Sequence, residues 1–278
     1  MNHFTVKQDK ENFEDYLWIY EKPTKKVFKR APKNIGFQNY FYSVKVEEEI
    51  SSIIEDGLAE IESEVAALFL QIINGRTKIS DLKERYNFGR FICFLNYRTV
   101  KADTIFNILN QNVLKDAFVD QMNHEGGVEE YLNKHGKDWS PERFVDSFNK
   151  MKLKLPKEMK LHLMINAAAR MIPSLCVRKW SFLKVHSNSI PFITSDHPVI
   201  LYNANCPQDN FMPGYYLKET EIFFPISPEI CFYASFSTKE GTQLISNEEV
   251  IKINTKINEF ANQYLFSNKS GFQSLFLT

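Results

Sequence analysis

The residues of this sequence that could do chemistry gather around F-I-T-S-D-H-P-V, at positions 192 to 199. Asp196 ends an apolar, strand-like run and precedes His197-Pro198. A carboxylate in this position can act as a general base, as a metal ligand, or as a turn cap for backbone N–H groups. His186 ends the preceding apolar run, and it either meets Asp196 across a hairpin as a proton relay or is an exposed histidine.

Arg98 and Glu62 are a second pair of charged candidates. Glu55 and Glu62 are two helical turns apart, on one face and close to an apolar stripe, where a carboxylate is costly unless it is paired. Arg98 follows a strongly apolar segment and needs an acceptor such as Glu62 or Asp196. The pair forms either a structural salt bridge or part of an active site, with Arg98 as anion clamp and Glu62 as second acid.

Several familiar catalytic patterns are absent from the sequence. Ser195 lacks the G-x-S-x-G turn that exposes a serine nucleophile, and no histidine has the partner that an H-E-x-x-H zinc site requires. The cysteines lack the C-x-x-C spacing with which one loop binds zinc, which favours reduced, mostly buried thiols. No metal ligand is assigned, although a divalent metal held by Asp196, Glu62 and a further acid stays open.

Composition and charge restrict the partners. The 278 residues include 34 basic and 34 acidic side chains, so no global field favours nucleic acid or an anionic membrane. The polar N-terminus and the lack of any 18-residue apolar run predict a cytoplasmic protein without a membrane span. One local basic patch contacts phosphate or is a solvated hairpin; it comprises Lys22, Lys25, Lys26, Lys29, Arg30 and Lys33.

Helical patterns fill the middle of the chain and strand patterns fill most of the last third. Apolar periodicity and capping signals predict helices over 47–74, 81–101, 102–121 and 128–135, from Ser140, after Pro156 toward Pro173, and over 247–264. Alternating and β-branched runs predict strands over 16–21, 27–29, 177–186, 191–194, 199–202, 222–225, 230–236 and 272–277. The runs 177–186 and 191–194 should form a hairpin, and 203–220 should be an irregular loop.

Helices grouped first and strands grouped second predict an α+β fold. We expect a mostly antiparallel sheet, with a large helical layer inserted between an N-terminal hairpin and the C-terminal strands. A single domain should span 1–278. Its parts are the hairpin and aromatic loop (1–43), the helical region (44–175), and the sheet with its closing helix (176–278).

Fragments along nearly the whole chain resemble a bacterial family known as domain of unknown function 4238. F-I-T-S-D-H-P-V and F-P-I-S-P (224–228) are similar to its F-I-T-S-D-N-P-V and P-L-S-P elements, and Tyr97-Arg98-Thr99 is similar to its R-T-P element. Trp180, Asn254 and His3 match further family positions, and we expect them to bind substrate. The resemblance supplies positions and no reaction. Near His3 the family's H-Y-V-P-Q pattern is altered.

Two functions fit these observations. The first is a hydrolase acting on a phosphate-containing or nucleic-acid substrate, with Asp196 as base or metal ligand. The alternative is a non-catalytic binding or regulatory module of a bacterial defence or stress system, for instance in phage defence, with a protein partner. In the alternative, Asp196, Asn254 and the Arg98–Glu62 pair form a buried polar network that fixes the fold.

Overall fold

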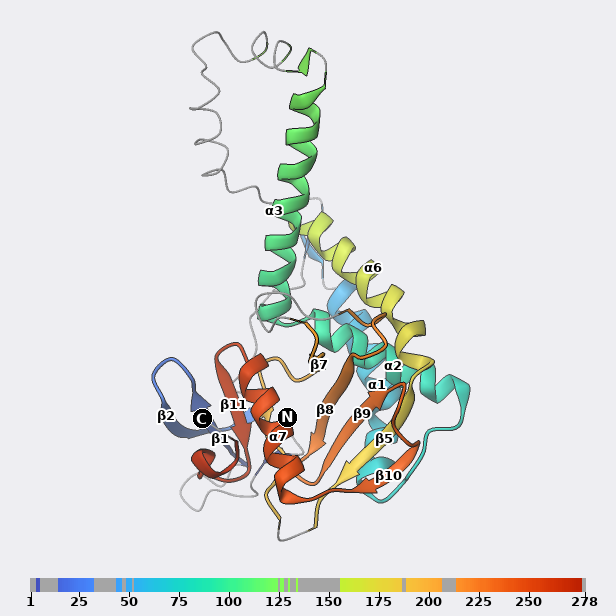
Figure 1. Cartoon of the computed structure of the whole chain (residues 1–278), viewed down its shortest axis with the longest axis vertical. Coiled ribbons are helices and arrows are strands. Elements are labelled where there is room, and N and C mark those ends of the chain that lie inside the picture. Colours follow the sequence, from blue (N-terminus) through green and yellow to red (C-terminus); the bar gives the residue numbers. More distant parts are fainter. Residues whose placement is uncertain are drawn as a thin grey trace.

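The structure is a computed structural model, shown in Figure 1. It describes residues 4–5, 15–32, 44–46, 49–51, 53–124, 126–127, 130, 134, 156–186, 189–206 and 214–276. The helices that we predicted over 128–135 and from Ser140 lie largely or wholly outside these residues.

A five-stranded sheet, in the order β10-β5-β9-β8-β7, forms the centre of the fold. The strands are β5 (Lys179–Lys184), β7 (Ile200–Tyr202), β8 (Glu221–Ser227), β9 (Ile230–Ser235) and β10 (Gly241–Leu244). All neighbours are antiparallel except β10 and β5, which are parallel. The prediction of an α+β fold with mostly antiparallel strands is therefore confirmed.

Helices cover both faces of this sheet. Successive side chains of a strand point to opposite faces, so each strand contributes to two cores. Phe182 and Phe224 belong to one core, on the side of three helices, whereas Leu183 and Phe223 belong to a second core on the side of α7. Burial on both faces explains why β8 and β9 are apolar almost without interruption. The helices are α1 (Ile53–Ile73), α2 (Leu82–Tyr97) and α6 (Lys157–Cys176) on the first side and α7 (Asn247–Phe260) on the second.

A second sheet, in the order β2-β1-β11-β6, joins distant parts of the chain. Its strands are β1 (Leu17–Glu21), β2 (Lys26–Arg30), β6 (Thr194–Ser195) and β11 (Tyr264–Ser267). The predicted N-terminal hairpin is confirmed as β1 and β2. Strand β11 lies between this hairpin and β6, so the second sheet brings the chain's beginning and end beside the segment that contains Asp196.

Helix α3 (Val100–Asn123) extends away from both sheets, as Figure 1 shows. Two short strands, β3 (Val44–Val46) and β4 (Glu49–Ser51), pair with each other, and a 3₁₀ turn, η3 (Phe272–Ser274), follows β11. None of the helices in the part of the chain that the structure describes has the length and apolarity to cross a membrane.

The predicted hairpin of 177–186 with 191–194 is wrong. Strand β5 has β9 and β10 as its two neighbours, so both of its edges are occupied. The chain then crosses to the other sheet, where β6 pairs with β11. This pairing joins residues about 70 positions apart, which no local pattern encodes.

Other elements also differ from the prediction. The helix predicted from residue 47 begins at Ile53, because 44–46 and 49–51, which contain β-branched residues, pair as strands. Helix α6 continues past Pro173 to Cys176, since a proline in the last turn removes only one hydrogen bond. Where an edge strand was predicted at 272–277, Phe272–Ser274 form a 3₁₀ turn, and Ser274 Oγ donates to the Gly271 carbonyl there.

Candidate functional site

Asp196 holds the turn that follows α7. Its Oδ1 accepts a hydrogen bond from the N–H of Asn262 (2.9 Å), and its Oδ2 accepts from Gln263 (2.7 Å) and Tyr264 (3.1 Å). Burial raises the pKa of this carboxyl, while the three N–H donors and Lys22 act in the opposite direction. Of the roles that we considered, the contacts of Asp196 are those of a backbone cap.

Two lysines bind the carbonyl end of α7 beside this turn. Lys22 Nζ donates to the carbonyls of Asn258 (2.5 Å) and Ala261 (2.9 Å), and Lys101 Nζ donates to that of Phe260 (2.6 Å). Cations stabilise the negative end of a helix dipole. Burial is the main cause that lowers the pKa of Lys101 to about 8, and the charge of nearby Lys22 contributes to this shift. Lys22 belongs to the basic patch that we expected either to contact phosphate or to be a solvated hairpin, and here its ammonium group instead binds backbone carbonyls of the fold.

The segment after β6 contacts the start of α3 through Thr99 and His197. The sequence analysis had instead considered a contact between Arg98 and Asp196. Thr99 Oγ1 and His197 Nδ1 are 2.7 Å apart, and both residues are buried. Arg98 and Asp196, one position earlier in each segment, share no contact among the described residues. Burial lowers the pKa of His197 to about 3, with a further contribution from Lys101, so its imidazole stays neutral at physiological pH.

We expect His197 to make the free energy of unfolding depend on pH between about 6.5 and 3. The unfolded histidine has the higher pKa, near 6.5, so it takes up a proton first as the pH falls. The stability from neutral His197 is complete above pH 6.5 and is lost progressively toward pH 3. Asparagine cannot titrate in this pH range. His197→Asn should therefore reduce the slope of the free energy of unfolding against pH, by at most ~1.4 kcal/mol per pH unit.

Urea unfolding of both proteins between about pH 4.5 and 7.5 measures this slope. His162→Asn, the same change at an exposed position, should leave it unchanged. Equal slopes for the native protein and His197→Asn would contradict the prediction.

Arg98 is paired with Glu62, one of the two acceptors that we predicted. Arg98 Nη1 donates to Glu62 Oε1 across the α2–α1 contact, and the side chains are 32% and 49% exposed. An exposed ion pair of this kind contributes ~1 kcal/mol or less to stability. The network hypothesis required this pair to be buried, and the hydrolase hypothesis required it to lie beside Asp196. The pair meets neither requirement.

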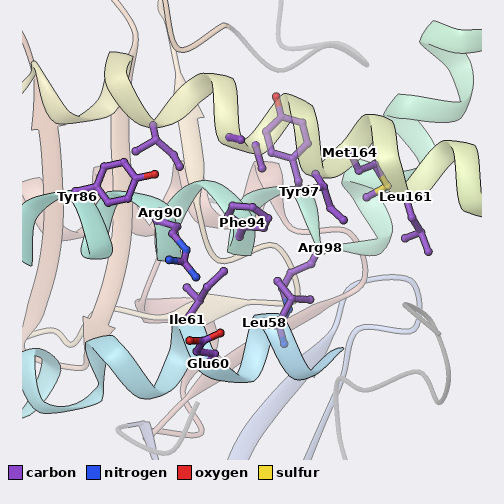
Figure 2. A pocket seen from close by; sticks show the side chains of 15 residues that line it. Leu58, Glu60, Ile61, Tyr86, Arg90, Phe94, Tyr97, Arg98, Leu161 and Met164 are labelled. Atoms are coloured by element: carbon purple, nitrogen blue, oxygen red, sulfur yellow. The ribbon is translucent and has the colours of Figure 1, made fainter. Parts of the chain in front are cut away.

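Beside this pair lies a pocket of about 480 Å³ between α1, α2 and α6. Figure 2 shows Arg90 and Arg98 reaching from α2 toward α1, and Tyr97 pointing toward α6. The lining is mostly apolar; it includes Leu58, Ile61, Phe94, Leu161, Met164 and Ile172. Arg90 has a loose ion pair with Glu64, with 3.6 Å between Nη1 and Oε2. A cavity with apolar walls and few polar groups is typical of a small-molecule site.

Apart from Arg98, the residues of α2 that line this pocket were not recognised as a site by the sequence analysis. Tyr86, Arg90, Phe94 and Tyr97 recur at helical spacing along one face of α2, and all four line the pocket. The opposite face, with Phe88 and its neighbours, packs into the core. Apart from Arg98, we interpreted this helix only through its apolar residues, although the recurring aromatic and basic side chains were a readable signal.

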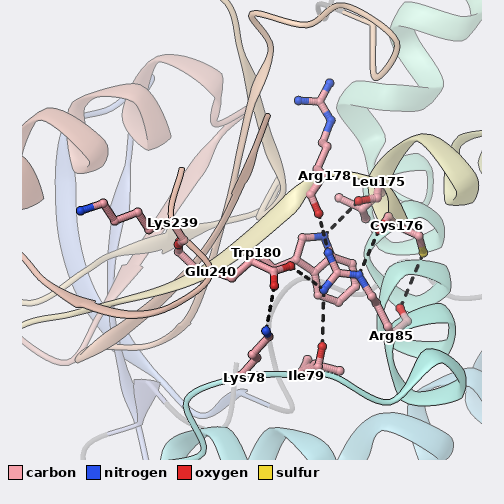
Figure 3. A network of polar contacts seen from close by, with 10 residues as sticks. Lys78, Ile79, Arg85, Leu175, Cys176, Arg178, Trp180, Lys239 and Glu240 are labelled. Carbon is pink, nitrogen blue, oxygen red and sulfur yellow. Dashed lines mark hydrogen bonds and ion pairs between the residues drawn. The ribbon is translucent and has the colours of Figure 1, made fainter. Parts of the chain in front are cut away.

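Trp180 lies in the core, away from both the pocket and Asp196. The residue is 3% exposed, and its Nε1 donates to the Leu175 carbonyl (3.0 Å). The Arg85 guanidinium stacks 4.1 Å from the ring centroid and donates to the carbonyls of Cys176 and Arg178 (Figure 3). This position leaves no free indole face for a substrate.

The other residues predicted for the site do not gather around Asp196 in the described structure. Asn254 is fully buried and binds three backbone groups, of Pro191, Ile193 and Leu275. His186 is exposed, and no described contact joins it to Asp196 because the expected hairpin does not form. His3 lies outside the described residues. Within the described ranges, no three His, Cys, Asp or Glu side chains are grouped as metal ligands.

Comparison with known proteins relates the chain to one family. The sequence model of a family described as "Protein of unknown function (DUF4238)" matches residues 2–271. No curated protein and no solved structure matches.

Proposed function

The chain belongs to the DUF4238 family, as its motifs led us to expect, and we propose that it is a non-catalytic binding module for an amphipathic organic anion. The observation that carries the proposal is the pocket between α1, α2 and α6, which combines apolar walls with Arg90 and Arg98. An apolar chain or ring would lie against Leu58, Phe94 and Met164. A carboxylate or phosphate would then bind the arginines, because a planar guanidinium can donate two parallel hydrogen bonds to either anion.

The residues first considered for hydrolysis support binding over catalysis. Both oxygens of Asp196 accept backbone N–H groups, and Glu62 is 49% exposed in a pair with Arg98. A general base must reach the proton that it removes. Asp196 does not line the pocket.

The hydrolase hypothesis is tested by assaying hydrolysis of bis(p-nitrophenyl) phosphate and of RNA with added Mg²⁺ or Mn²⁺. Turnover that is lost in a folded Asp196→Asn variant would overturn the binding proposal.

Binding of decanoate and of decanol, below their aggregation limits, tests the proposal directly. The two probes share an apolar chain and differ in charge. We expect decanoate to bind at least about tenfold more tightly, because a hydrogen bond to a charged group contributes ~1.5–3 kcal/mol. Arg90→Met should remove this preference and leave decanol binding intact. Isothermal titration calorimetry measures both affinities.

Arg170→Met is the matched control, because Arg170 is exposed on α6 and does not line the pocket. Its affinities should equal those of the native protein. Equal affinity for decanoate and decanol, or no binding of either, would contradict the proposal.

Two finer parts of the proposal concern the protein's setting. We place it in the cytoplasm, which is supported by its four free cysteines. We also keep the expectation that it acts as a regulatory module in a bacterial defence or stress system. In that setting the bound anion would be the signal and a protein would be the partner.

A further inference from the structure

A second, smaller cavity lies where α2 ends and α3 begins. It has a volume of about 180 Å³ and is bordered by the turn at 214–216. An engineered cavity of ~150 Å³ holds benzene. The space is therefore sufficient for a molecule of one or two rings.

Asn96 places an unused carboxamide in this cavity. The residue is 1% exposed, and its Oδ1 has no hydrogen-bond partner among the described residues. The backbone carbonyl of Asn96 is engaged, since it accepts from Thr99 Oγ1 (3.3 Å). A buried polar atom without a partner costs about 1–3 kcal/mol, and such atoms are rare in native proteins. A ligand that donates a hydrogen bond to Oδ1 would remove this cost.

The remaining walls are aromatic or aliphatic and uncharged. Tyr97, Phe106, Tyr215 and Tyr216 supply rings, and the other lining residues include Ile105 and Met171. Burial raises the pKa of Tyr97 to about 12, so its hydroxyl keeps its proton at neutral pH. No lining side chain carries a charge, and transferring an ion into such a site is unfavourable. The cavity therefore suits a neutral, planar molecule.

We propose that this cavity binds a nucleobase or a similar neutral nitrogen heterocycle, through the carboxamide of Asn96. An asparagine side chain presents a carbonyl and an NH₂ group side by side. It pairs with a heterocycle edge that offers a donor next to an acceptor, as adenine does with N6 and N7. Aromatic side chains supply stacking surfaces for such bases. The proposal does not depend on the function assigned to the larger pocket, whose arginines do not line this cavity.

Titration of the native protein with adenine, uracil and toluene tests the proposal. We expect at least one of the two bases to bind, with an affinity at least about tenfold higher than that of toluene. Asn96→Leu, a change of similar size, should weaken base binding at least about tenfold and leave toluene binding unchanged or stronger. Ligand-observed nuclear magnetic resonance and calorimetry measure these affinities.

The melting temperature of Asn96→Leu without ligand gives an independent readout. Removing an unpartnered buried amide should raise it by a few degrees. Ala102→Leu, which fills the cavity from α3, should abolish the binding of every probe, whereas Leu82→Ala, at a residue that is 82% exposed, should change nothing.

Three results would overturn the proposal. One is that neither base binds at millimolar concentration. Another is that toluene binds as tightly as the bases, which would make the cavity a purely apolar site. The last is a melting temperature of Asn96→Leu below that of the native protein, which would give the carboxamide a structural role.

Discussion

Replacing Arg178 by alanine should lower the free energy of unfolding by ~3–5 kcal/mol. The side chain is 0% exposed and donates to the carbonyls of Tyr215 (2.6 Å), Leu217 (2.8 Å) and Thr220. Its guanidinium also lies 4.5 Å from the ring centroid of Phe236. Burial lowers the pKa of Arg178, and none of the carboxylates in the described residues forms an ion pair with it. The hydrogen bonds to the 215–220 turn thus have to outweigh the cost of burying the charge.

Urea unfolding of Arg178→Ala, Arg178→Lys and Arg170→Ala measures this effect. Lysine keeps the charge without the planar fork of donors, so Arg178→Lys should lose nearly as much stability as Arg178→Ala. Arg170 is exposed, and Arg170→Ala should change stability by less than ~0.5 kcal/mol. A loss below ~1 kcal/mol in Arg178→Ala would mean that desolvation of the charge cancels its hydrogen bonds.

The elements that the sequence predicted well are those whose signals are local. Helix α7 begins with a capping box, in which Ser246 and Glu249 bind each other's backbone N–H groups. The hairpin of β1 and β2 and the adjacent strands β8 and β9 are likewise joined by short turns. In each case the residues that fix the element are its neighbours in the chain.

The strand pairings that the sequence missed join distant residues. Strand β10 pairs in parallel with β5, which lies about 60 residues earlier, and β11 inserts between β1 and β6. Strand β10 is short and mostly polar, so it lacks the apolar pattern on which the prediction rested. Such pairings follow from the packing of the whole sheet, which a single sequence does not display.

The candidate site shows the same limit at the level of single residues. The sequence correctly identified Asp196 as a carboxylate at a strand end and Glu62 as an acceptor for Arg98. It could not show that the N–H groups of 262–264 would surround Asp196, because those donors belong to the backbone of a distant turn. Residue type indicates which chemistry is available, whereas neighbouring atoms decide which role is used.

Replacing Asn254 tests most directly whether the polar side chains around the Asp196 segment stabilise the fold. We expect Asn254→Leu, a change of similar size, to lower the free energy of unfolding by ~3–5 kcal/mol. Asn254 Oδ1 accepts from the Ile193 N–H (3.1 Å), and Nδ2 donates to the carbonyls of Pro191 (2.9 Å) and Leu275 (2.8 Å). Leucine would leave all three backbone groups without this partner in the core.

Hydrogen exchange and urea unfolding distinguish this role from one in substrate binding. If Asn254 joins the 191–193 segment to the C-terminal turn, Asn254→Leu should increase exchange in both segments and lower stability. Asn258→Leu, the same change one turn later at a partly exposed position, should do neither. Normal stability in Asn254→Leu, combined with weaker ligand binding, would instead return Asn254 to the binding role first predicted for it. The two roles thus differ in whether Asn254→Leu loses stability, because only the structural role requires the carboxamide when no ligand is present.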